Sequence, residues 1–89
     1  MRLRYSSRAL AQLASVHDHL KERNPAAARN VTRSIRQTVA RLMSLPQLGK
    51  LTDEPDIRVL IEPEYVYRIF YRVDGEVVTV IRILHGSQR

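Results

Sequence analysis

The sequence contains no cysteine, no tryptophan and only three glycines. Without cysteine, the chain forms neither disulfides nor thiolate metal sites, and its redox compartment is not revealed. No apolar run approaches the roughly 20 residues that a membrane-spanning helix needs. The N-terminal segment also lacks an apolar stretch of signal-peptide length. We therefore expect a cytoplasmic protein that does not associate with a membrane.

Acidic residues and lysine are scarce as well. Nine aspartates and glutamates are set against 15 basic residues, which gives a net charge of +6, and only Lys21 and Lys50 are lysines. The guanidinium group of arginine is planar and weakly hydrated, so it binds phosphate and carboxylate groups and stacks on flat rings. This balance fits a nucleic acid, an acidic protein surface or an acidic binding partner, and it also fits an ordinary basic surface.

The 89 residues, 44% of them hydrophobic and 27% charged, are enough for one small domain spanning residues 1–89. The sequence begins with "RLRYS", in which apolar and charged residues alternate. This alternation predicts a short strand that buries Leu3 and Tyr5 on one face.

Two amphipathic helices are predicted next, over residues 8–24 and residues 25–45. Ser6 or Ser7 can accept a hydrogen bond from the first free amides of the first helix. Asn24-Pro25 ends that helix and begins the second, so the two helices form an antiparallel hairpin. The apolar stripes consist of Ala9, Leu13, Val16 and Leu20 on the first helix and Val31, Ile35, Val39 and Leu42 on the second.

Residues 47–56 are predicted to be a polar loop in which Gly49 serves a turn, and the rest is typical of β-strands. "IRVLIE" precedes "YVYRIFYRV" and "EVVTVIRIL", and the Asp74-Gly75 between the last two is a strong hairpin signal. Both faces of these strands are substantially apolar, so we expect helices on one face and a partner on part of the other. The predicted fold class is α+β, with the order β-α-α-β-β-β and an N-terminal helical hairpin packed on a small, mostly antiparallel sheet.

His85, at the end of the last predicted strand, has two interpretations. Histidine is a common general acid or base, so His85 can serve in metal-free RNA cleavage, with Arg68 and Arg82 stabilising charge on the phosphate. A hairpin symmetric about its turn places Arg68 opposite Ile81, which leaves open whether Arg68 and Arg82 share a face. Alternation also places His85 with Ile81 and Ile83, which favours a hydrogen-bonded residue at a strand end over a catalyst.

Other polar groups carry less information. Arg29, Arg33 and Arg36 are spaced at i, i+4 and i+7 on the second helix, and are most simply a solvated face. The two histidines of the first helix lack acidic neighbours at a useful ligand spacing, so no metal is expected. No glycine-rich phosphate loop is present, and no cofactor is expected.

Several features occur in a characteristic order. They are an opening strand with an aromatic, a helix pair joined at "NPAAA", then "LPQLGK", "IRVL", "YVYRIFYRV", a "DG" turn and "VIRILHGSQR". This ordered set resembles the RelE/ParE superfamily of bacterial toxins over essentially the whole chain. The resemblance implies a toxin of a type II toxin–antitoxin system, neutralised by a cognate antitoxin.

The superfamily has two branches with different targets. RelE-like toxins cleave mRNA in the ribosome, and ParE-like toxins poison DNA gyrase. The helical hairpin with "NPAAA", together with the lack of an aromatic after Tyr71 and of a basic run after His85, is more similar to ParE. The resemblance therefore favours a gyrase-binding toxin with no catalytic residue.

These considerations assign residues to two surfaces. The residues expected to bind the target are Arg58, Arg68, Arg82, His85 and Arg89. The residues expected to bind an acidic antitoxin, in a hetero-oligomeric complex, are Leu13, Val16, Leu20, Arg68 and Arg72. The alternative is a RelE-like, ribosome-dependent mRNA endonuclease in which Arg68, Arg82 and His85 contribute to cleavage. A basic nucleic-acid-binding module is a second alternative.

Overall fold

The computed structural model describes residues 1–85 of the chain. In this part, two α-helices accompany a five-stranded sheet of strand order β1-β5-β4-β3-β2, in which only the β1–β5 pair is parallel. The elements are β1 (Arg2–Tyr5), α1 (Ser7–Lys21), α2 (Pro25–Ala40), the 3₁₀ helix η1 (Arg41–Met43), β2 (Lys50–Leu51), β3 (Arg58–Glu62), β4 (Tyr67–Asp74) and β5 (Val77–His85). The predicted α+β class is confirmed, and the short strand β2 is an addition inside the predicted polar loop.

Local signals determine where both helices begin. The Ser6 hydroxyl accepts a hydrogen bond from the Ala9 amide at 3.0 Å, and the Asn24 side chain accepts one from the Ala27 amide at 3.1 Å. Pro25 occupies the start of α2, where an amide would have no partner inside the helix. The predicted helical hairpin and its joint at Asn24-Pro25 are therefore confirmed.

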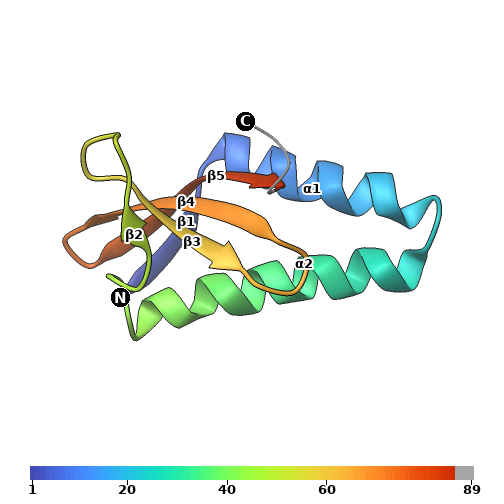
Figure 1. The fold of residues 1–89 in the computed structure, drawn as a ribbon, viewed down its shortest axis with the longest axis horizontal. Helices are drawn as coiled ribbons and strands as arrows, with labels where there is room; N and C mark the ends of the chain where they lie inside the picture. Colours follow the sequence, from blue (N-terminus) through green and yellow to red (C-terminus); the bar gives the residue numbers. More distant parts are fainter. Residues whose placement is uncertain (86–89) are drawn as a thin grey trace.

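Both helices pack against the same face of the sheet, and the end of the hairpin extends beyond the strands (Figure 1). The other face carries no helix. The described part of the chain contains no helix long and apolar enough to cross a membrane. The main buried cluster between the helices and the sheet consists of Ala9, Leu13, Val31, Ile35, Val39, Ile69, Val80 and Ile83.

The β4–β5 turn lies one residue later than predicted. Asp74 is the last paired residue of β4, and Gly75 and Glu76 form the turn. Gly75 has a φ of 57°, a left-handed conformation that glycine adopts without a steric penalty.

A β-bulge then changes the register between β4 and β5. The ladder is regular as far as Tyr71, which pairs with Val80, but the next pair is Phe70 with Arg82. Ile81 is therefore an extra residue in β5. Because side chains alternate between the two faces of a strand, one extra residue moves every later side chain to the opposite face.

The bulge decides which functional candidates share a face, whereas the shifted turn changes each cross-strand partner by two residues and leaves the faces unchanged. Arg68 pairs with Leu84 rather than lying opposite Ile81, so the predicted register is wrong. As a result, Arg82 joins Arg68 on the face without helices. His85 lies on the helix-covered face.

A buried tyrosine holds the loop between η1 and β2. The Tyr71 hydroxyl donates a hydrogen bond to the Pro46 carbonyl and accepts one from the Gly49 amide, both at 2.8 Å. Burial raises the pKa of Tyr71 above its ordinary value. A Cβ atom on Gly49 would lie 2.7 Å from both the Tyr71 ring and the Val59 carbonyl oxygen. Close approach of Tyr71, and not the predicted turn, therefore explains this glycine.

The carboxylate of Glu62, at the end of β3, is fully buried. It accepts hydrogen bonds from the Ser34 hydroxyl of α2 at 2.5 Å, the Tyr65 amide at 2.7 Å and the Glu64 amide at 2.9 Å. Burial by itself would raise the pKa of Glu62, but the hydrogen bonds outweigh it and hold the pKa below its ordinary value. These bonds anchor the β3–β4 turn, in which Val66 adopts a strained φ of 61°.

Candidate functional site

Two arginines and a phenylalanine meet on the helix-free face of the sheet. Phe70 and Arg82 are direct neighbours across β4 and β5, and Arg68 lies on the same face of β4. The guanidinium carbon of Arg82 lies 4.1 Å from the centre of the Phe70 ring, and that of Arg68 lies 5.7 Å from it. We call these three residues the Arg–Phe cluster. Such cation–π contacts orient the guanidinium groups and contribute about 0.5–2 kcal/mol each.

Arg82 also forms an ion pair with Glu54, which lies in the loop between β2 and β3. Their side-chain atoms Nη2 and Oε1 are 2.5 Å apart, and the Glu54 side chain is 55% exposed. The Arg82 side chain is only 17% exposed, so the solvent reaches this ion pair mainly from the Glu54 side. Ion pairs that reach the solvent contribute about 0–1 kcal/mol.

Apolar side chains border the Arg–Phe cluster. Ile61 on β3 lies opposite Arg68 and is 47% exposed, and Val59 lies opposite Phe70. Oriented arginines next to exposed aliphatic surface are typical of protein-binding surfaces. The helix-free face thus has the chemical character of an interface.

His85 is not part of this cluster. Its ring packs edge-on against Tyr67, with ring centres 5.1 Å apart and an interplanar angle of 79°. Tyr67 packs against the core beneath the helices. The His85 imidazole therefore lies on the opposite face of the sheet from Arg68 and Arg82, and the structure does not bring the three residues of the nuclease hypothesis together.

The other basic residues predicted at the two surfaces lie apart from one another. Arg58 donates a hydrogen bond to the Gly49 carbonyl at 2.8 Å, so it supports the loop before β2. Arg72 lies on the same face as the Arg–Phe cluster and forms an exposed ion pair with Asp74 at 2.6 Å. Arg89 lies outside the described residues.

The apolar residues assigned to the antitoxin lie mainly inside the protein. Leu13 is 4% exposed, and Val16 and Leu20 are half-buried against the same core. Leu10, on the preceding turn of α1, is 49% exposed and lines a shallow depression between α1 and α2 together with Leu13. Leu10 therefore offers more apolar surface to a partner than the three predicted residues. The position of Leu10 at the edge of the apolar stripe of α1 was the feature of the sequence that could have indicated it.

The site suits anion binding better than acid–base catalysis. Two guanidinium groups can stabilise negative charge, but proton transfer also needs a group within hydrogen-bond reach of the reacting atom. His85, the candidate for that role, lies on the other face of the sheet. No group of three or more metal-ligating side chains occurs among residues 1–85.

Comparison with known proteins identifies the family. A sequence model described as the ParE toxin of the type II toxin–antitoxin system parDE matches residues 3–89. The chain belongs to the ParE toxin family. It is also 30% identical over 81 residues to Toxin RelE2 of Caulobacter vibrioides, which covers 91% of this chain and 90% of the relative. The predicted membership of the RelE/ParE superfamily is confirmed.

Solved structures share the fold of this ParE-family toxin. The chromosomal ParDE TA system from P. aeruginosa matches with a TM-score of 0.84 and 24% identity, covering 96% of this chain and 95% of the other. The intact E. coli RelBE toxin-antitoxin complex matches with a TM-score of 0.70 and 22% identity, covering 99% and 98% of the two chains. Both neighbours thus share the overall fold of this chain.

Proposed function

We propose that this ParE-family toxin acts by binding DNA gyrase and does not itself cleave RNA. The observation that carries the proposal is the separation of Arg68 and Arg82 from His85 on opposite faces of the sheet. Metal-free cleavage needs an acid, a base and cations around one phosphate. The Arg–Phe cluster with its aliphatic border instead suits a protein surface that carries carboxylates. The ParE family match supports gyrase as that protein.

We expect the purified toxin to inhibit plasmid supercoiling by gyrase and to leave ribosome-bound mRNA intact. The physical reason is that the cluster can hold a carboxylate of the target but has no imidazole beside it. A gel assay of supercoiling and primer extension on translating ribosomes measure the two activities. Cleavage of mRNA in the ribosomal A site that is lost on His85→Ala would replace this proposal with the ribosome-dependent endonuclease.

A cognate acidic antitoxin is the second partner. The structural neighbours are toxin–antitoxin systems, which supports such a partner for this chain. Its binding surface includes the depression between α1 and α2, where the exposed Leu10 provides the apolar contact and Arg36 and His17 line the edge. An acidic segment with aliphatic anchors complements this surface, because it matches both the apolar floor and the net charge of +6.

We expect the association rate of toxin and antitoxin to fall as salt rises, while the dissociation rate changes little. Charge steers the encounter, whereas buried apolar anchors hold the complex. Stopped-flow association and competition-based dissociation at about 0.05 M and about 1 M NaCl measure the two rates, since the higher salt shortens the screening length to about 3 Å. Rapid dissociation at the higher salt would show that ion pairs hold the complex.

A further inference from the structure

The longest stretch without an acidic residue runs from Arg23 to Thr52 and contains six basic residues. It includes the whole of α2, which carries three arginines and no carboxylate. The exposed face of a helix commonly mixes both signs, because opposite charges three or four residues apart stabilise the helix. The α2 surface therefore differs from an ordinary solvated face in having one sign of charge only.

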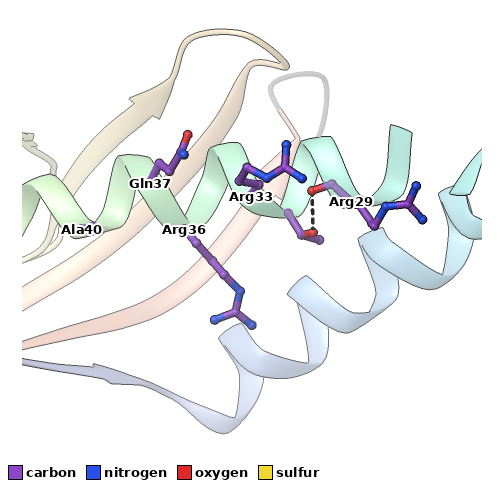
Figure 2. Close-up of a pocket in the computed structure, with 6 residues that line it drawn as sticks. Arg29, Arg33, Arg36, Gln37 and Ala40 are labelled. Atoms are coloured by element: carbon purple, nitrogen blue, oxygen red, sulfur yellow. Dashed lines mark hydrogen bonds between the residues drawn. The ribbon is translucent and has the colours of Figure 1, made fainter. Parts of the chain in front are cut away.

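The three arginines of α2 are spaced at i, i+4 and i+7 along the helix, and we call them the α2 arginine row. Their side chains diverge, with Arg36 directed toward α1 and Arg33 away from it (Figure 2). Arg29, Arg33 and Arg36 are exposed and line a shallow hollow of about 450 Å³ along one side of the helix (Figure 2). Arg33 donates a hydrogen bond to the Asn30 side chain at 3.2 Å, and the Arg36 guanidinium carbon lies 5.8 Å from the centre of the Tyr5 ring. Contacts within the chain thus orient two of the three guanidinium groups.

The α2 arginine row forms no ion pair within residues 1–85, although Glu64 lines a small pocket together with Arg33. Like charges four residues apart on a helix repel each other, so the row destabilises the isolated helix slightly. A polyanion bound along the row would remove this repulsion.

We propose that the α2 arginine row binds the phosphate backbone of double-stranded DNA. Arg29 and Arg33 are separated by about 6 Å along the helix axis, given a rise of 1.5 Å per residue. Arg36 lies about 4.5 Å further along, so the row spans about 10.5 Å. One DNA strand carries a phosphate about every 3.4 Å of duplex axis, so the long side chains of the row can reach about three neighbouring phosphates of one strand.

Duplex DNA fits this surface better than the other polyanions do. The major groove of B-DNA is about 12 Å wide and admits the exposed side of a helix, whereas the major groove of an RNA duplex is deep and narrow. An acidic peptide would need apolar anchors as well, and these lie beside Leu10 in the depression that Arg36 also lines, not along Arg29 and Arg33. The row also lies on the helix side of the sheet, away from the Arg–Phe cluster, so DNA and the toxin's target can bind together.

The test is fluorescence anisotropy of a labelled duplex of about 20 base pairs, titrated with purified toxin over a salt series of about 50–200 mM NaCl. Three phosphate contacts predict a dissociation constant in the range of about 1–100 μM and a slope of log K against log salt near −2.7. The Arg29→Gln and Arg33→Gln double variant should reduce the slope to about −0.9. The matching double lysine variant should retain the wild-type slope, because it keeps both charges.

Arg72→Gln is the control for the loss of a positive charge elsewhere, because Arg72 lies on the other face of the sheet and pairs with Asp74. Arg72→Gln should leave the slope of log K against log salt unchanged, while Arg33→Gln alone should make this slope less steep by about 1. Circular dichroism checks that each variant is folded. The proposal fails if DNA does not bind, if Arg72→Gln and Arg33→Gln weaken binding equally, or if an RNA duplex or polyglutamate binds more tightly than DNA.

Discussion

Replacing Glu62 with alanine is expected to lower the free energy of unfolding by about 3–5 kcal/mol. The variant removes the acceptor for the Ser34 hydroxyl and for the amides of Glu64 and Tyr65. It also releases the turn that holds Val66 in a strained conformation. For a chain of this size the loss corresponds to a fall of roughly 12–40 °C in melting temperature. Thermal unfolding followed by circular dichroism at neutral pH measures it.

Glu76→Ala is the matched control, because Glu76 is an exposed residue of the β4–β5 turn. We expect it to change the free energy of unfolding by no more than about 0.5 kcal/mol. Equal destabilisation by the two variants would show that the hydrogen bonds of Glu62 contribute little.

The Glu62 carboxylate also makes stability depend on pH in a defined direction. Its pKa in the folded protein lies below the ordinary value of 4.5. The ionised group therefore contributes fully above that value, and its contribution is lost as the pH falls below 4.5 through the folded pKa. Glu62→Gln should be less stable than the wild type at neutral pH and should lose less stability on acidification. Parallel pH profiles of melting temperature for the two proteins would contradict this assignment.

The double variant Arg68→Ala, Arg82→Ala is expected to bind the toxin's target at least about 100-fold more weakly. Each charge-assisted hydrogen bond contributes about 1.5–3 kcal/mol, which is a factor of ten or more in affinity. The two effects should not simply add, because both guanidinium groups contact Phe70. Gyrase binding in vitro and growth after induction of the toxin measure the loss.

Glu54→Gln distinguishes a binding role of Arg82 from a structural one. If Arg82 binds a carboxylate of the target, removing its internal partner frees it, and target affinity should rise. If the Arg82–Glu54 pair merely supports the fold, Glu54→Gln and Arg82→Ala should weaken binding together. Arg41→Ala, an exposed charge on η1, is the control for net charge. Unchanged toxicity of the double variant at normal protein levels would remove the Arg–Phe cluster from the target-binding surface.

Much of the fold can be predicted from the sequence, because the signals for it are local. Ser6 and Asn24 cap the helices that follow them, and Pro25 suits only the first turn of a helix. The stripe from Ala9 to Leu20 marks the buried side of α1, and the alternation around Tyr71 marks the buried side of β4. Each of these signals involves residues that are close to one another in the sequence. The ordered set of elements was then enough to indicate the superfamily.

The composition of the site was decided by tertiary structure. One extra residue, Ile81, places Arg82 beside Phe70 and sends His85 to the other face, and a strict two-residue alternation gives no sign of it. The partners Arg82 and Glu54 are 28 residues apart in the chain, so the sequence, which indicates only a polar loop around Glu54, gave no sign of this ion pair.

The same distinction explains the remaining differences between sequence and structure. Gly49 is required because the ring of Tyr71, 22 residues later in the chain, leaves no space for a side chain. The buried Glu62 carboxylate accepts a hydrogen bond from the Ser34 hydroxyl of α2, 28 residues earlier. Capping, periodicity and turn chemistry involve neighbours in the chain, so the sequence by itself determined the two helices, the four longer strands and the resemblance to the superfamily. Register, ion pairing and burial depend on how those elements meet in space, so only the folded structure separated Arg68 and Arg82 from His85.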